Sequence, residues 1–148
     1  MPKPSFHNLK TAYERLMKAY PDFHPCDGPY RNQCAIRMSI ALNDEMTVKV
    51  NAGTYSAAKC GHGHARSAGD LAAFLWRKVG CPKIYKEIAR GKLAIGEKTG
   101  IVFFRDCFTR AGEKKANGDH LDLWDRGKTM TFDDPTNASA AMWFWELA

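Results

Sequence analysis

Long hydrophobic runs are missing from this sequence. No apolar stretch approaches the roughly 20 residues that a helix needs to cross a bilayer. The first residues, Met1-Pro2-Lys3-Pro4-Ser5-Phe6, lack the apolar segment of a secretory signal peptide. No long polar tract indicates disorder. These absences predict a protein that is made in the cytoplasm without a signal peptide and does not insert into membranes.

Clustered basic residues are also missing. The chain has 22 lysines and arginines against 16 acidic residues, a formal net charge of +6, but these residues are scattered. A charge of that sign favours an anionic partner, which includes nucleic acid, an anionic membrane, a cell-wall polymer and an acidic protein. Because the sequence holds no arginine-rich run and no interleaved aromatic and basic residues, we predict that the partner is not a nucleic acid.

No two cysteines have the Cys-x-x-Cys spacing, which argues against a four-cysteine zinc site. The five cysteines are Cys26, Cys34, Cys60, Cys81 and Cys107. An odd number fits one reactive thiol with up to two disulfides, and it equally fits five reduced thiols. The sequence therefore leaves the pairing of the four cysteines other than Cys34 open.

One short segment, Cys60-Gly61-His62-Gly63-His64, carries a thiol and two imidazoles that could bind a metal. Its Cys-x-His-x-His spacing is more compressed than that of usual zinc sites, and no partner pair of ligands follows at a distance. A glycine-rich loop is the plainer interpretation. We therefore predict neither a metal nor another cofactor.

Size and composition indicate one domain over residues 1–148. The hydrophobic fraction of 45% is sufficient for a packed core, and the chain is too short for two domains of usual size.

Three segments have the periodicity of amphipathic helices. They are residues 8–20, a segment that opens near Cys34, and a segment that Ser67 caps and Gly80 ends. The predicted buried faces are Leu9, Tyr13, Leu16 and Tyr20 in the first helix, Ile36, Met38, Ile40 and Leu42 in the second, and Leu71, Phe74, Leu75 and Val79 in the third. Residues 43–55 are expected to form a loop or short strand, and residues 84–88 one or two further helical turns.

Strands are predicted in the second half of the chain. Residues 101–104 are apolar and rich in β-branched and aromatic side chains, as in a central strand. Residues 119–124 and 129–133 form a hairpin, and residues 143–145 form the last strand. Helices followed by an antiparallel sheet make an α+β domain.

Cys34 is the candidate nucleophile. It follows a turn-rich segment, and Asn32, a good N-cap residue, stands two positions before it. Cys34 should therefore lie in the first helical turn, where backbone N–H groups and the helix dipole favour a thiolate. The alternative is a small buried residue, which is what most free cysteines are.

The hairpin supplies a candidate base. If residues 125–128 form the loop, Trp124 pairs with Thr129, and the antiparallel register sets His120 opposite Asp133. Side chains directly opposite share one face, with Cβ atoms about 4.5–5.5 Å apart. Asp133 can then accept a hydrogen bond from the His120 ring and leave the other nitrogen for a cysteine.

Together these residues are predicted to form a catalytic triad, with Cys34 as nucleophile, His120 as base and Asp133 as orienting acid. Asp122 is a rival for the third role because it lies on the same face two residues after His120, and Asp134 points to the other face. The alternative for His120 is a partly exposed strand residue. No substrate-binding residue is assigned.

Three blocks of this sequence resemble the type VI secretion amidase effectors of the fourth family. They are Asn32-Gln33-Cys34-Ala35-Ile36-Arg37-Met38-Ser39, Gly100-Ile101-Val102-Phe103-Phe104 and Gly118-Asp119-His120-Leu121-Asp122-Leu123-Trp124. Pro4-Ser5-Phe6 and His64-Ala65-Arg66 also fit, so the resemblance covers most of the chain in order. It implies an NlpC-type, papain-like cysteine peptidase in which N-terminal helices pack on a C-terminal antiparallel sheet.

The resemblance also implies a function. Such effectors cut the γ-D-glutamyl–meso-diaminopimelate bond of peptidoglycan stems, are injected into a neighbour's periplasm by the type VI apparatus, and are neutralised by a cognate immunity protein. By this likeness Cys34 corresponds to the nucleophile and His120 to the base, and the acid falls in the region of Asp133 and Asp134. The alternative is a basic, non-enzymatic binding or adaptor domain. The oligomeric state and the identity of the immunity protein stay open.

Overall fold

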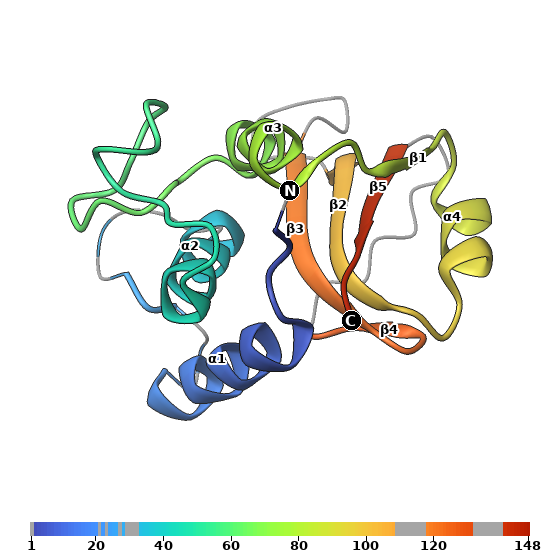
Figure 1. Ribbon diagram of the computed structural model, residues 1–148, viewed down its shortest axis with the longest axis horizontal. Coiled ribbons are helices and arrows are strands. Elements are labelled where there is room, and N and C mark those ends of the chain that lie inside the picture. The colour runs from blue at the N-terminus through green and yellow to red at the C-terminus, as the bar shows by residue number, and fades with distance from the viewer. Residues whose placement is uncertain are drawn as a thin grey trace. The chain divides into compact units, whose positions relative to one another are not determined.

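The computed structural model describes residues 2–20, 22, 24–26, 28, 33–108, 118–131 and 141–148. It divides into two compact units, Met1–Gly80 with Ala148, and Cys81–Leu147. The first unit contains three helices, and the second contains a sheet with one helix (Figure 1). An α+β fold with helices first is confirmed. None of the helices among the described residues is long and apolar enough to cross a membrane.

Helix α1 (Phe6–Ala19) begins two residues earlier than its periodicity predicts, because Ser5 caps it. The Ser5 hydroxyl accepts a hydrogen bond from the backbone N–H of Asn8 and so satisfies one of the donors that a helix start leaves unpaired. Leu9, Tyr13 and Leu16 are buried as predicted. The prediction that Tyr20 is buried is wrong, since Tyr20 follows the helix and is exposed.

Helix α2 (Cys34–Glu45) starts at the candidate nucleophile. Its N-cap is Gln33 and not Asn32, and Asn32 lies outside the described residues. Ile36, Met38 and Leu42 are fully buried as predicted, and Ile40 is half-buried. The buried residues of the first turns, from Cys34 to Ser39, go round the whole helix and include polar ones, which indicates a helix enclosed on several sides.

Helix α3 (Ala68–Val79) agrees with its predicted cap and core face. Ser67 accepts a hydrogen bond from the backbone N–H of Asp70, and the helix ends before Gly80. Leu71, Phe74, Leu75 and Val79 are buried. Residues 46–66 form turns and loops with a single isolated bridge, between Lys59 and Ala65. The expected loop is therefore confirmed for residues 46–55 and wrong for residues 43–45, which still belong to α2.

The second unit is a five-stranded antiparallel sheet in the order β1-β5-β2-β3-β4. Its strands are β1 (Lys83–Tyr85), β2 (Thr99–Phe108), β3 (Gly118–Asp125), β4 (Lys128–Thr129) and β5 (Ala141–Glu146). The predicted central strand is β2, which pairs with both β3 and β5. A Cβ at Gly100 would lie 2.0 Å from the Trp145 carbonyl oxygen, so only glycine fits between these strands.

Helix α4 (Ile88–Ile95) lies beside β1 and β5 (Figure 1) and encloses an apolar cluster on one face of the sheet. This cluster consists of Ile88, Ile95, Val102, Phe104, Cys107, Trp124, Met142 and Phe144. Cross-strand partners share a face, so the register places His120 opposite Phe104 and Asp122 opposite Val102 on that same face. The candidate base thus lies on the sheet face that carries the apolar cluster.

The prediction for residues 84–88 is wrong. Ile84 belongs to β1, which pairs with β5 through Trp143, and the helix starts only at Ile88 and runs through Gly91. Three residues cannot show a periodicity, and the strand exists because β5 supplies its partner.

Candidate active site

Cys34 is the first residue of α2 and is almost fully buried, with 2% of its surface exposed. The first hydrogen bond of the helix runs from the Arg37 N–H to the Gln33 carbonyl, at 2.9 Å. The N–H groups of the first turn precede this bond and point along the helix axis toward its start. The prediction that Cys34 lies in the first turn is confirmed, and this position suits a negatively charged sulfur or an oxyanion.

Gln33 fixes the chain just before the nucleophile. Its Oε1 accepts a hydrogen bond from the Cys26 N–H at 2.9 Å, and its Nε2 donates one to the Cys26 carbonyl at 2.7 Å. Gln33 is 1% exposed, so both bonds are shielded from water. This explains why the Gln33 side chain does not cap α2: both of its polar atoms are used by Cys26. This pairing joins residues seven positions apart in the chain, and no sequence pattern predicts it.

His120 is hydrogen-bonded to an acidic side chain of its own strand. Its Nε2 lies 2.9 Å from Oδ2 of Asp122, and the two residues are 2% and 0% exposed. Because a carboxylate only accepts, Nε2 carries the proton, and in the neutral ring Nδ1 is then the basic nitrogen. The Phe104 ring stacks on the imidazole at 6.3 Å between centroids and 10° between planes.

Thr131 completes this arrangement. Its hydroxyl donates a hydrogen bond to Oδ2 of Asp122, and its backbone N–H donates to the same oxygen at 3.3 Å. The Thr131 Oγ1 also lies 3.3 Å from Nε2 of His120. The other oxygen of Asp122 accepts from the Leu123 N–H at 2.8 Å. Asp122 is therefore held at both oxygens, and it holds the imidazole in turn.

The predicted hairpin register is confirmed. Trp124 pairs with Thr129, and the turn is tighter than expected because Asp125 and Lys128 also pair. Continuing this register brings Thr131 opposite Asp122, as the contacts above bear out. Asp133 and Asp134 lie outside the described residues, so the predicted contact between His120 and Asp133 stays a prediction.

Comparison with known proteins agrees with this chemistry. The profile of the family described as "Type VI secretion system (T6SS), amidase effector protein 4" matches residues 30–145, which contain both Cys34 and His120. The chain belongs to this amidase effector family.

Solved structures of amidase effectors share the fold. A chain of the Tae4–Tai4 effector–immunity complex from Enterobacter cloacae aligns with a TM-score of 0.71 at 20% identity, covering 99% of this chain and 100% of that chain. The Tae4/Tai4 effector–immunity structure from Salmonella typhimurium gives a TM-score of 0.72 at 18% identity, with the same coverage. No curated protein sequence matches the chain. The papain-like α+β fold expected of an NlpC-type peptidase is thereby confirmed.

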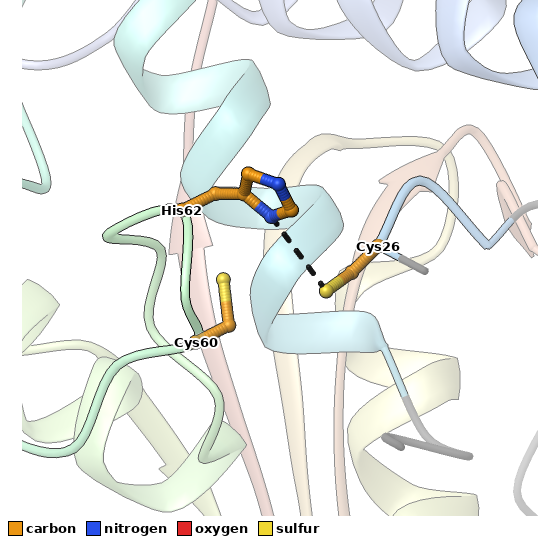
Figure 2. Close-up of side chains that lie close together, drawn as sticks. All are labelled: Cys26, Cys60 and His62. Carbon is orange, nitrogen blue, oxygen red and sulfur yellow. Dashed lines mark hydrogen bonds between the residues drawn. The ribbon is translucent and has the colours of Figure 1, made fainter. Parts of the chain in front are cut away.

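The amidase effector also contains a cysteine–histidine cluster that the predicted triad does not use. Cys26, Cys60 and His62 turn their sulfur and nitrogen atoms toward one another (Figure 2). The Cys26 Sγ lies 3.9 Å from Nδ1 of His62, and the Cys60 Sγ lies 3.9 Å from Nδ1 of His64. Burial lowers the pKa of His64, and the neighbouring His62 lowers it further.

Proposed function

We propose that this effector is an antibacterial D,L-endopeptidase that hydrolyses the γ-D-glutamyl–meso-diaminopimelate bond of peptidoglycan stems. The family supplies the amidase chemistry. The net charge of +6 suits a substrate that carries free stem carboxylates. The single observation that carries the proposal is the hydrogen bond between Nε2 of His120 and Asp122, because it prepares the ring for a catalytic role.

In the proposed mechanism, His120 takes the proton of the Cys34 thiol at Nδ1. The Cys34 sulfur attacks the γ-glutamyl carbonyl carbon, and backbone N–H groups at the start of α2 stabilise the oxyanion. His120 then gives its proton to the departing amine of diaminopimelate. Water, deprotonated by the same nitrogen, hydrolyses the thioester and restores the thiol.

The third member of the triad is proposed to be a carboxylate that accepts from Nε2 and stabilises the imidazolium during the attack. Asp122 makes this contact among the described residues. Asp133, which the hairpin register favours, is the alternative, and the variants discussed below separate the two.

The substrate is tested by mass spectrometry of purified peptidoglycan after incubation with the protein. The expected fragments end in D-glutamate on one side and start with a free amine of diaminopimelate on the other. The Cys34→Ala protein should give none of them while its circular dichroism spectrum is unchanged. Cleavage at another bond, or the same fragments from the Cys34→Ala protein, would refute the proposal.

The site of action is proposed to be the periplasm of a target cell, reached through the type VI apparatus, and a cognate immunity protein is the proposed partner in the producing cell. The two Tae4 structures described above were determined with Tai4, which supports such a partner. Expression with an added periplasmic signal peptide should lyse a Gram-negative host, whereas cytoplasmic expression should be harmless. Equal toxicity from both compartments would instead point to a cytoplasmic target.

A further inference from the structure

We propose that Cys26, Cys60 and His62 form a binding site for one zinc ion. The three ligand atoms lie within 4.8 Å of one another, in the first unit of the chain. None of the three residues is part of the proposed triad. The sequence arguments against a metal were the compressed Cys-x-His-x-His spacing and the lack of a distant partner pair. The structure supplies one distant ligand, Cys26, 34 residues before Cys60.

The spacing of the atoms is close to what zinc requires. With Zn–S bonds of about 2.3 Å and Zn–N bonds of about 2.0 Å, a tetrahedral site separates its ligand atoms by about 3.5–3.8 Å. The observed 3.9 Å between the Cys26 Sγ and Nδ1 of His62 is longer by only a few tenths of an ångström. A small inward movement of Cys60 completes the set. Water or His64, whose Nδ1 is 3.9 Å from the Cys60 Sγ, can take the fourth position.

The surroundings of the sulfur atoms favour metal-bound thiolates. The Gly28 N–H donates to the Cys26 Sγ at 3.4 Å, as outer partners of metal ligands commonly do. Both cysteines are buried, at 6% and 5% exposure, and pack with Ile36 and the half-buried Ile40. His62 is exposed, so a metal ion can enter from its side. A buried sulfur pair with an apolar lining suits a structural metal site, and His64 as fourth ligand would close it, as structural zinc sites are closed.

The protein holds the two ligand-bearing segments in place without a metal. Cys26 is fixed at its backbone by the Gln33 side chain. The turn that carries Cys60 and His62 is closed by a hydrogen bond from the Cys60 N–H to the His64 carbonyl, at 2.8 Å. The hydroxyl of Ser39, in α2, accepts from the Ala65 N–H at 3.0 Å and attaches this turn to the helix. Because the ligands are prepositioned, zinc binding has little ordering entropy to overcome.

The donor set selects the kind of metal. Two thiolates and an imidazole suit Zn²⁺ and disfavour Mg²⁺ and Ca²⁺, which prefer oxygen ligands. A bound ion would link the Cys26 segment to the turn at residues 60–64, and both contact α2, which starts at Cys34. The inferred role is therefore to stabilise the part of the fold that presents the nucleophile.

The test uses the full-length protein, reduced and freed of metal with a chelator. Titration with Zn²⁺ against a chromophoric chelator should give one site per chain, and Co²⁺ should give the visible bands of a tetrahedral site with sulfur-to-cobalt charge transfer. Zinc should also raise the melting temperature. Removing a ligand, as in Cys60→Ser or His62→Ala, should weaken zinc binding by roughly 100-fold or more, beyond the about 10–100-fold that loss of an outer-shell partner causes.

Two matched controls keep the test decisive. Cys81→Ser removes the exposed cysteine, and Cys34→Ala removes the proposed nucleophile, and both should bind zinc as the unchanged protein does. The exposed position of His62 makes His62→Ala safe for folding even where a buried cysteine variant fails to fold. The proposal is overturned if the reduced protein binds no zinc at micromolar concentration, if His62→Ala binds it equally well, or if only Cys34→Ala loses it. None of these results depends on peptidoglycan cleavage.

Discussion

Nε2 of His120 lies 2.9 Å from Oδ2 of Asp122, and both residues belong to one strand, β3. A strand places residues i and i+2 on the same face, and side chains in strands lean along the strand direction. The imidazole can therefore reach the carboxylate without a partner from another strand. Thr131, from the segment that follows β4, adds the hydrogen bonds that hold the carboxylate.

This relationship predicts the effect of removing each candidate acid. Asp122→Ala should lower turnover of peptidoglycan by about 100-fold or more, because the imidazole loses its tautomer control and the imidazolium its counter-charge. Asp122→Asn should lower turnover in a similar way while the hydrogen bond to the Leu123 N–H is kept. Asp133→Ala and Asp134→Ala are the matched comparisons, assayed on the same substrate with circular dichroism as the check on folding.

The comparison decides between two arrangements. Near-normal turnover in Asp133→Ala beside an inactive Asp122→Ala would assign the third role to Asp122. An inactive Asp133→Ala beside an active Asp122→Ala would instead support the cross-strand contact that the register predicts. In that case the bond between His120 and Asp122 would be structural only.

The hairpin is the part of the site that the sequence predicts best. The pairing of Trp124 with Thr129 follows from alternation and turn residues, which are local signals, and the structure confirms it. The same register puts Thr131 beside Asp122, yet the sequence does not rank a neighbour on the same strand against a neighbour opposite. That ranking depends on the orientation of the His120 ring, which stacks on Phe104 of the neighbouring strand.

The elements that the sequence missed depend on contacts between distant segments. Strand β1 pairs with β5 across about 60 residues of chain, so its three residues carry no periodic signal of their own. Helix α4 runs through Gly91, where a Cβ would lie 2.5 Å from Cε of Met142, so the glycine serves close packing against a distant segment. The cluster of Cys26 with Cys60 and His62 was missed for the same reason.

Alkylation of Cys34 should abolish activity. Iodoacetamide at neutral pH is expected to inactivate the protein at the rate at which mass spectrometry finds the label on Cys34, because an alkylated sulfur can no longer attack the substrate. The Cys81→Ser background removes the exposed cysteine that would otherwise consume reagent. Inactivation that precedes labelling of Cys34, or labelling of Cys34 only in unfolded protein, would argue against its role as nucleophile.

Glu45 is expected to make a pH-dependent contribution to the stability of the folded protein. Partial burial raises its pKa, but the Ser5 N–H, the Thr47 hydroxyl and the Thr47 N–H together outweigh burial, and the pKa falls below its ordinary value of 4.5. The Ser5 N–H donates to Oε2 at 2.8 Å and so joins the start of α1 to the end of α2. A lowered folded-state pKa means that the carboxylate stabilises the fold above pH 4.5.

Glu45→Gln should therefore lower the free energy of unfolding at neutral pH, by at most about 1 kcal/mol because the site is partly exposed to solvent. The difference from the unchanged protein should shrink as the pH falls through the lowered pKa of Glu45. Asp44→Asn is the matched control, since Asp44 forms an exposed ion pair with Arg15 at 3.5 Å. Urea unfolding at several pH values measures the free energy of unfolding of both variants. If Glu45→Gln lost the same free energy at every pH, the expectation would be contradicted.

Replacing Tyr55 is expected to change the free energy of unfolding in the opposite direction from replacing Glu45. It is 2% exposed, and its hydroxyl has no hydrogen-bond partner among the described residues. Burial, and after it the charge of Asp70, raises the pKa of Tyr55 to about 12. A buried hydroxyl without a partner retains its desolvation cost and contributes no compensating bond. The ring itself is well packed, edge to face against Phe74 at 5.2 Å between centroids.

Tyr55→Phe removes the hydroxyl and keeps the ring, so the free energy of unfolding should stay level or rise by up to about 1 kcal/mol. Tyr13→Phe is the matched control: Tyr13 is equally buried, but its hydroxyl contacts the Met38 sulfur at 3.9 Å, and its loss should destabilise the fold. Because folding raises the pKa of Tyr55 from its ordinary 10 to about 12, the phenol ionises first in the unfolded state, and the unchanged protein loses stability as the pH rises from 10 to about 12. Tyr55→Phe should therefore lose less stability than the unchanged protein between these pH values. A loss at neutral pH as large as that of Tyr13→Phe would mean that the Tyr55 hydroxyl is hydrogen-bonded in solution, through a buried water molecule.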